Sequence, residues 1–116
     1  MPVVPPLRRR ADFEAVGRRG AARSTPTLVL RWAWTGRGET RLGVSTPRSL
    51  GGAVQRNRLR RRLRELVRAR IGRIGPGWDL LLIARPASRE ASYTELGAAL
   101  DALIERSEIG RDAHRE

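Results

Sequence analysis

The stretch that decides the fold lies at residues 51–71 and reads GGAVQRNRLRRRLRELVRARI. Its apolar residues recur at i, i+4, i+7, i+8 and i+12, which is one stripe of an α-helix; they are Leu59, Leu63, Leu66, Val67 and Ile71. Five arginines lie off this stripe, namely Arg58, Arg61, Arg62, Arg64 and Arg68. Because a disordered basic tail would not keep this periodicity, we predict an amphipathic helix over residues 54–71 with an arginine face.

Two strands and a short helix are predicted before this segment. Residues 27–34 are rich in β-branched and aromatic side chains, which is typical of a strand. Its alternation predicts one apolar face, formed by Leu28, Leu30, Trp32 and Trp34. A glycine-containing turn at 35–38 leads to a second strand at 39–46, so we expect these two strands to form a hairpin. A basic helix over residues 7–19 comes first.

A strand and a helix are predicted after the arginine-rich segment. Residues 80–83 are continuously apolar, which favours a strand over 78–84 that is buried on both faces. Ser92 and Glu95 match a capping box, in which each side chain binds a free amide at a helix start. The order α-β-β-α-β-α predicts an α+β fold, a small sheet with helices packed on it. We expect one domain over residues 1–116, with flexible tails at 1–6 and 107–116.

The charge is large and unevenly distributed. The chain of 116 residues carries 24 basic and 12 acidic side chains, for a net charge of +12, and every basic residue is an arginine. Residues 8–73 hold 19 arginines against four acids, whereas residues 74–116 hold five arginines against eight acids. A basic chain of this size usually binds a polyanion. Coding bias explains the absence of lysine, but it does not explain why the cations cluster.

The usual constellations for self-contained catalysis are missing. Cysteine is absent and the single histidine, His114, stands near the end of the chain, so thiol nucleophiles and His-based triads are excluded. No spacing of acids and histidine is typical of a metal site, and no glycine-rich loop joins a strand to a helix. No run is long and apolar enough for a membrane span, and the first residues do not form a secretory signal. We therefore expect a cytoplasmic protein that binds neither a membrane nor a small-molecule substrate.

The arginine helix suits a phosphate backbone. A guanidinium is planar, keeps its charge, binds phosphate oxygens in pairs and stacks on bases. Helical spacing predicts that Arg58, Arg61, Arg62 and Arg64 lie along one side. The residues alone leave three alternatives open: a structural RNA-binding protein of the ribosomal type, a DNA-binding protein that uses this helix in a major groove, and an autonomous nuclease. The helix lacks the variety of Asn and Gln that reads base edges, which counts against the second.

The motifs resemble one family in particular. The sequence RLGVS at 41–45, followed by GGAVQRNRLRRRLRE at 51–65, is similar to the signature of the protein subunit of bacterial ribonuclease P. The basic start with Asp12 and Phe13, the strand from Asp79 to Pro86 and the helix start at Ser92 resemble the same family in the same order. The resemblance covers roughly residues 7–106.

This resemblance implies a fold and a division of labour. It implies an α-β sandwich in which the central helix joins two strands by a left-handed crossover, against the usual right-handed rule. It also implies that an RNA subunit performs the hydrolysis that removes the 5′ leader from precursor tRNA. The Mg²⁺ that this reaction needs would be bound mainly by the RNA, and the protein would bind that RNA and precursor tRNA.

Carried over by position, the resemblance assigns two groups of residues. The group facing the RNA subunit would be Arg56, Asn57, Arg58, Arg60, Arg61 and Arg64. Asn57 would bind an RNA group or cap local backbone. The group in the cleft for the single-stranded leader would be Phe13, Arg9, Arg10, Arg31 and Arg48, with Phe13 stacking on a base or serving only as a core anchor.

Some positions depart from the family pattern. Gly17 and Arg31 stand where aromatic residues are common, and Gly52 replaces a usual asparagine. Arg31 would then stack or bind a phosphate in place of the aromatic.

Overall fold

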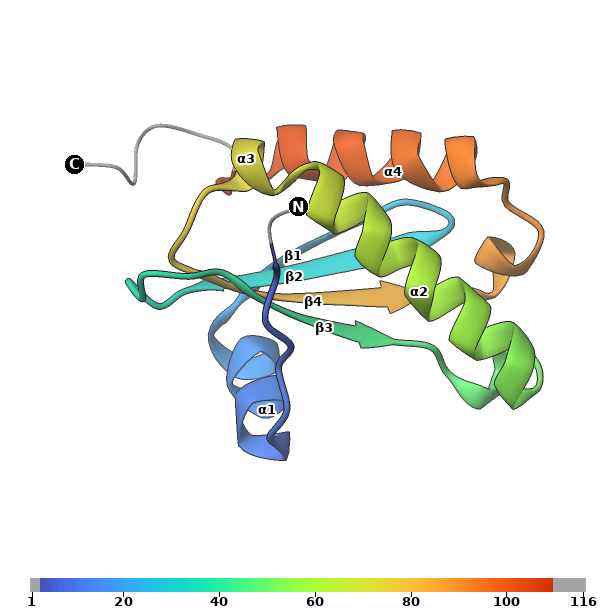
Figure 1. Ribbon diagram of the computed structural model, residues 1–116, viewed down its shortest axis with the longest axis horizontal. Coiled ribbons are helices and arrows are strands. Elements are labelled where there is room, and N and C mark those ends of the chain that lie inside the picture. The colour runs from blue at the N-terminus through green and yellow to red at the C-terminus, as the bar shows by residue number, and fades with distance from the viewer. Residues whose placement is uncertain (1–2, 110–116) are drawn as a thin grey trace.

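The computed structural model describes residues 3–109, which form one sheet with helices on both faces (Figure 1). In chain order the elements are α1 (Arg10–Arg19), β1 (Ala21–Ser24), β2 (Leu28–Trp34), β3 (Arg41–Ser45), α2 (Ala53–Ala69), α3 (Ile71–Ile74), β4 (Trp78–Ala84) and α4 (Tyr93–Arg106). Two 3₁₀ turns, Arg48–Leu50 and Pro86–Arg89, precede α2 and α4. The predicted α+β class is confirmed.

The sheet has the strand order β1-β2-β4-β3, and this corrects the predicted hairpin. β2 does not pair with β3, because β4 lies between them, antiparallel to β2 and parallel to β3. The partner of β2 in a hairpin is instead β1, which the sequence did not predict. Thr25 closes that turn, since its hydroxyl accepts the Leu28 N–H at 3.1 Å.

The connection from β3 to β4 runs through α2. Parallel neighbours require such a crossover, and α2 and α3 supply it. In Figure 1 the helices α2 and α4 lie above the sheet and α1 lies below it, with β3 and β4 both running to the right and β4 behind β3. The path from β3 over α2 to β4 is therefore left-handed, as the family resemblance implied and contrary to the usual hand.

The main core lies between the sheet and the helices α2 and α4. The predicted helical stripe is buried, with Leu59, Leu63, Leu66 and Val67 packed against it. The helix ends at Ala69, two residues before the predicted end, and the chain then forms the short α3. β4 is buried on both faces as predicted: Leu80 and Leu82 face the main core, whereas Leu81 belongs to a second cluster under α1.

Trp34 corrects the predicted apolar face of β2. Leu28, Leu30 and Trp32 are buried as expected, but Trp34 is 50% exposed. It is the last residue of β2, where its ring meets Trp78 edge to face at 5.0 Å and lies over Gly77. Gly77 has φ +101°, and a Cβ there would lie 2.4 Å from the Trp34 ring, so only glycine fits under this tryptophan.

Parts of the two predicted tails pack against the rest of the protein. Pro5 and Leu7 pair with Leu42 along the free edge of β3, through hydrogen bonds of 2.8 and 3.0 Å, so the first helix begins at Arg10 rather than at residue 7. After α4, Ser107 and Ile109 are each only 2% exposed. Residues 1–2 and 110–116 of the predicted tails lie outside the described residues.

Candidate nucleic-acid interface

The sequence spacing predicted that four arginines of α2 lie along one side, but Arg64 lies apart from the other three. Arg58 and Arg62 line hollows that open toward the start of α4, beside Ser92 and Tyr93. Arg64 lies on the opposite flank, where it borders a narrow gap with Pro6 and Leu42 beside β3. Arg61 borders the same hollow as Arg58 and Arg62, and the buried stripe separates these arginines from Arg64. We call the two groups the α4 flank and the β3 flank of α2.

At the start of α2 a small hydrogen-bond network holds Arg60 in place. One guanidinium nitrogen of Arg60 donates to the Asn57 Oδ1 at 2.7 Å, and another donates to the Thr46 hydroxyl at 2.6 Å. Arg56 reaches the same loop and donates to the Thr46 carbonyl at 3.5 Å. Asn57 therefore orients Arg60, and it does not cap the helix. The N-cap is Gly52, whose N–H donates to the Gln55 side chain at 3.2 Å.

The remaining arginines of the motif are exposed and have no protein partner. Within residues 3–109, no hydrogen bond or ion pair is formed by the side chains of Arg58, Arg61 or Arg64. The acids that form ion pairs in this part of the chain lie elsewhere: Asp12 and Asp79 bind Arg41, and Asp101 binds Arg70 and Arg73. The helix thus presents a row of cations whose charge the described part of the protein does not neutralise.

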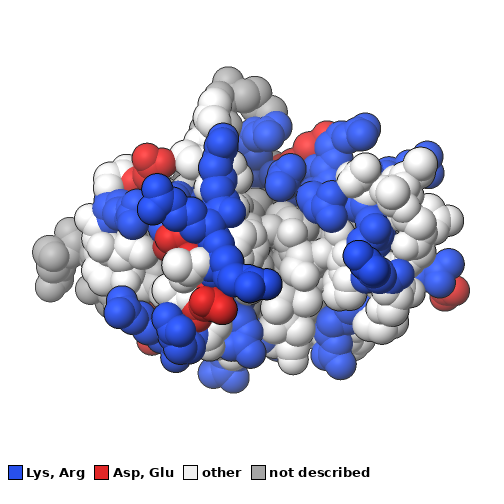
Figure 2. All heavy atoms as spheres, turned by 90° about the horizontal axis from the view of Figure 1, so that it is seen from below, with Lys and Arg blue, Asp and Glu red and all other residues white. Residues whose placement is uncertain are grey.

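A second basic surface lies on the opposite face of the sheet. Figure 2 shows this face, where a strip of uncharged surface runs between two groups of basic side chains. Its floor includes the half-buried Val29, Ser45 and Ile83, which alternate with core residues on their strands. The helix α1 covers only one end of the floor (Figure 1).

The predicted leader residues flank this strip. Phe13 is half-buried: its ring packs with Leu7 and Val16 and lies directly over Gly43, where a Cβ would come within 2.6 Å of it. Arg9 and Arg10 are exposed at the start of α1. Arg48 is exposed on the 3₁₀ turn beyond the far end of β3, so it does not lie with the α1 group.

Arg31 joins β2 to α1. Its guanidinium donates to the Gly17 carbonyl at 3.4 Å, and a Cβ added at Gly17 would meet nothing within 4 Å. Two of the three positions that depart from the family pattern are thus direct neighbours. The space beside Gly17 is open, and the Arg31 side chain lies at its edge.

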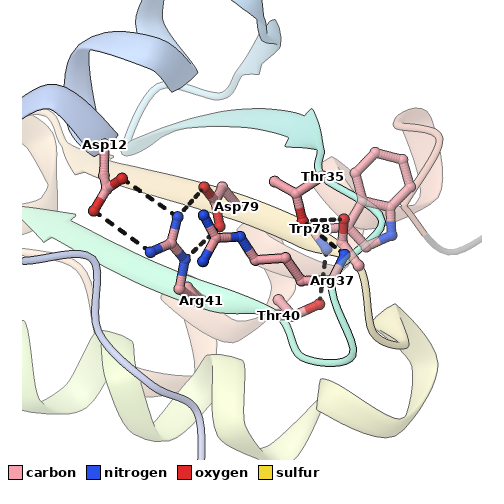
Figure 3. Close-up of polar contacts among 8 residues, drawn as sticks. Asp12, Thr35, Arg37, Thr40, Arg41, Trp78 and Asp79 are labelled. Atoms are coloured by element: carbon pink, nitrogen blue, oxygen red, sulfur yellow. Dashed lines mark hydrogen bonds and ion pairs between the residues drawn. The ribbon is translucent and has the colours of Figure 1, made fainter.

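An ion-pair clamp that the sequence did not predict fixes α1 on the sheet (Figure 3). Arg41 of β3 donates two hydrogen bonds to Asp79 of β4, at 2.9 and 2.6 Å, and two longer ones to Asp12 of α1, at 3.4 and 3.5 Å. The hydrogen bonding of Arg41 to Asp79 is the main reason that the pKa of Arg41 is raised above its usual value, while burial opposes it. Asp79, the one acid in an apolar strand, was the sequence signal for such a clamp. Because Asp12 precedes Phe13, the clamp also positions that ring.

The described residues hold neither a cluster of metal-binding side chains nor a membrane-spanning helix. No group of three His, Cys, Asp or Glu side chains comes together anywhere in residues 3–109. In the same range no helix is both long enough and apolar enough to cross a membrane.

Comparison with known proteins identifies the family. The family model for ribonuclease P matches residues 1–108. The chain belongs to the ribonuclease P protein family. It is a protein component of ribonuclease P, the ribonucleoprotein endoribonuclease that processes the 5′ leaders of precursor tRNAs, and its partner is the ribonuclease P RNA. The ribosomal, DNA-binding and autonomous-nuclease alternatives are thereby set aside.

Individual relatives agree with this family. The ribonuclease P protein component of Roseiflexus sp. strain RS-1 is 40% identical over 104 residues, which cover 89% of this chain and 85% of the relative. That of Acidothermus cellulolyticus is 42% identical over 102 residues, covering 86% and 85%. Among solved structures, the ribonuclease P protein of Thermotoga maritima superposes with a TM-score of 0.81 at 29% identity, over 89% of this chain and 97% of that one. The Staphylococcus aureus protein superposes with a TM-score of 0.85 at 22% identity, over 94% of this chain and 100% of that one. This similarity supports the fold alone.

Proposed function

We propose that this ribonuclease P protein binds the RNA subunit through α2. The observation that carries the proposal is the set of exposed arginines without a protein partner, in a helix whose other side is buried in the core. Mutual repulsion among these cations is relieved when they bind phosphates, and each guanidinium can bind phosphate oxygens in pairs. The residues assigned to this contact are Arg56, Asn57, Arg58, Arg60, Arg61 and Arg64.

We propose that the single-stranded 5′ leader of precursor tRNA binds the strip on the opposite face. Phe13 is accessible enough to stack on an unpaired base, and the half-buried floor residues Val29, Ser45 and Ile83 carry no charge, which suits bases more than phosphates. Arg9 and Arg10 on one side and Arg48 on the other would bind the leader phosphates. Arg31, held beside Gly17, would bind a phosphate where an aromatic ring is common in the family.

We assign Mg²⁺ and the hydrolysis to the RNA partner. The carboxylates of Asp12 and Asp79 both bind the Arg41 guanidinium, so these two acids do not fit a metal ion. The protein contributes binding and orientation of two RNAs, and we place this activity in the cytoplasm, where precursor tRNA is processed.

Substitution of the free arginines tests the α2 proposal. We expect Arg58→Ala, Arg61→Ala and Arg64→Ala together to weaken binding of the RNA subunit. They should also lower the slope of log affinity against log salt by about one for each lost phosphate contact. A filter-binding titration at several salt concentrations measures this slope. An unchanged slope would show that α2 faces solvent in the complex.

The leader proposal needs a separate comparison. We expect Phe13→Ala to weaken binding of precursor tRNA more than binding of mature tRNA, because only the precursor carries the leader. Phe13→Leu is the matched control, since it keeps an apolar side chain over Gly43 but removes the aromatic face. Equal losses for both tRNAs would favour a simple core anchor.

A further inference from the structure

The α4 flank of α2 borders a trough that is separate from the β3 flank. Two adjoining hollows make it, one of about 260 Å³ between α2 and the 3₁₀ turn before α4, and one of about 590 Å³ beside the first residues of α4. Arg58 and Arg62 line both hollows, so the two lie side by side. Arg89 borders the first hollow, and Tyr93, 44% exposed, borders the second.

The trough is strongly basic and its cations are not neutralised. Arg56, Arg58, Arg61, Arg62 and Arg89 line it, against Glu65 and Glu90. Within residues 3–109 neither glutamate comes within ion-pair distance of an arginine. The Nε of Arg56 is buried and has no hydrogen-bond acceptor, which is costly for a charged group unless a ligand supplies one. An anion in the trough would neutralise the exposed cations.

A single RNA strand on the β3 flank would not satisfy this trough. Arg62 and Arg64 are two residues apart on α2, so their side chains leave the helix axis about 200° apart. The helix with its side chains is about 10–12 Å across. A strand that follows Arg64 and Arg68 past Pro6 and Leu42 would have to cross the outer surface of the helix to reach Arg62.

We propose that the trough binds a second segment of the RNA subunit, so that α2 is held between two phosphodiester strands. Arg58, Arg62 and Arg89 bind the phosphates of this segment. The exposed ring of Tyr93 stacks on one of its unpaired bases, because an aromatic beside a basic groove is the usual arrangement for single-stranded nucleic acid. This inference rests on the proposed function of α2 and adds Arg62, Arg89 and Tyr93 to the RNA contacts.

Variants of each flank, each carrying two substitutions, test the inference. The α4-flank variant is Arg62→Ala with Arg89→Ala, and the β3-flank variant is Arg64→Ala with Arg68→Ala. The matched control is Arg23→Ala with Arg106→Ala, which removes the same charge from two exposed arginines on β1 and at the far end of α4. Thermal unfolding first establishes that all three variants fold. Affinity for the ribonuclease P RNA is then measured between 50 and 200 mM salt, with chemical protection of the RNA backbone read on the same complexes.

We expect the α4-flank variant to lower the salt slope by about 1.4, which makes its loss of affinity over this salt range about sevenfold smaller than that of the unmodified protein. We expect it to lose protection in one RNA segment, and the β3-flank variant to lose protection in a different one. Tyr93→Ala should weaken binding about tenfold, and Tyr93→Phe should not.

The possible failures are distinguishable. If the α4-flank variant behaves like the control while the β3-flank variant loses affinity, the second contact does not exist and the proposed function stands. If both variants lose protection in the same segment, a single strand contacts α2 and the inference is overturned. If neither variant differs from the control, the proposed function of α2 itself fails.

Discussion

We expect removal of the Arg41 guanidinium to destabilise the fold more than removal of any other charged side chain that reaches the surface. Asp79, whose side chain is only 7% exposed, would lose the two hydrogen bonds of 2.9 and 2.6 Å that bind its carboxylate. Breaking a buried pair by deleting one partner costs about 3–5 kcal/mol, because a buried charge is left without compensation. For a chain of this size we expect Arg41→Met to lower Tm by roughly 10–20 °C.

Two companion variants separate the parts of the clamp. Asp12→Asn breaks only the contacts of 3.4 and 3.5 Å to a carboxylate that is 22% exposed, so it should cost about 1 kcal/mol or less. Arg41→Met combined with Asp79→Leu removes both buried charges and should recover more than half of the loss. Urea unfolding followed by tryptophan fluorescence and circular dichroism measures all three. The reasoning is refuted if Arg41→Met costs less than 1 kcal/mol, or if the double variant is no more stable than the single one.

Three further predictions concern other parts of the molecule. The pKa of Asp101 is lowered, chiefly by its hydrogen bond from Arg70, so its contribution to stability is complete above the unfolded value of 3.8 and is lost as pH falls through the folded pKa. The free energy of unfolding of Asp101→Asn should therefore decrease less steeply as pH falls. Identical pH profiles for this variant and the unmodified protein would contradict this. Ser92→Ala should cost about 1 kcal/mol in urea unfolding, because it removes the acceptor at 3.0 Å from the Glu95 N–H; Thr94→Ala is the control, and equal costs would argue against the cap. Gly43→Val should cost about 1–3 kcal/mol, because its side chain would collide with Phe13, and an unchanged urea midpoint would show that the ring moves freely.

The elements with strong local signals were predictable from the sequence. The periodicity of Leu59 and Leu63, the continuous apolar run of β4 and the capping box at Ser92 each gave the correct element. The pairing of strands was not predictable in this way, because it depends on contacts between residues far apart in the chain. β4 is apolar on both faces and so takes the centre of the sheet, which separates β2 from β3. β1 was missed because all four of its residues are exposed and carry no apolar alternation.

The candidate site was predicted in type but not in arrangement. Spacing identified the arginines of α2, yet it could not show which flank faces β3 and which faces α4, because that depends on how the helix is rotated on the sheet. The same applies to Arg41, whose partners come from α1 and β4. The neighbouring positions of Gly17 and Arg31 likewise required the packing of α1 against β2.

Reconstitution tests most directly the claim that this chain assists a catalytic RNA. The protein is combined with a bacterial ribonuclease P RNA, and cleavage of precursor tRNA is measured at a magnesium concentration too low for the RNA alone. We expect the protein to restore cleavage at the 5′ end of the mature tRNA, and to show no cleavage without the RNA. Failure to restore cleavage, or cleavage by the protein alone, would contradict the account.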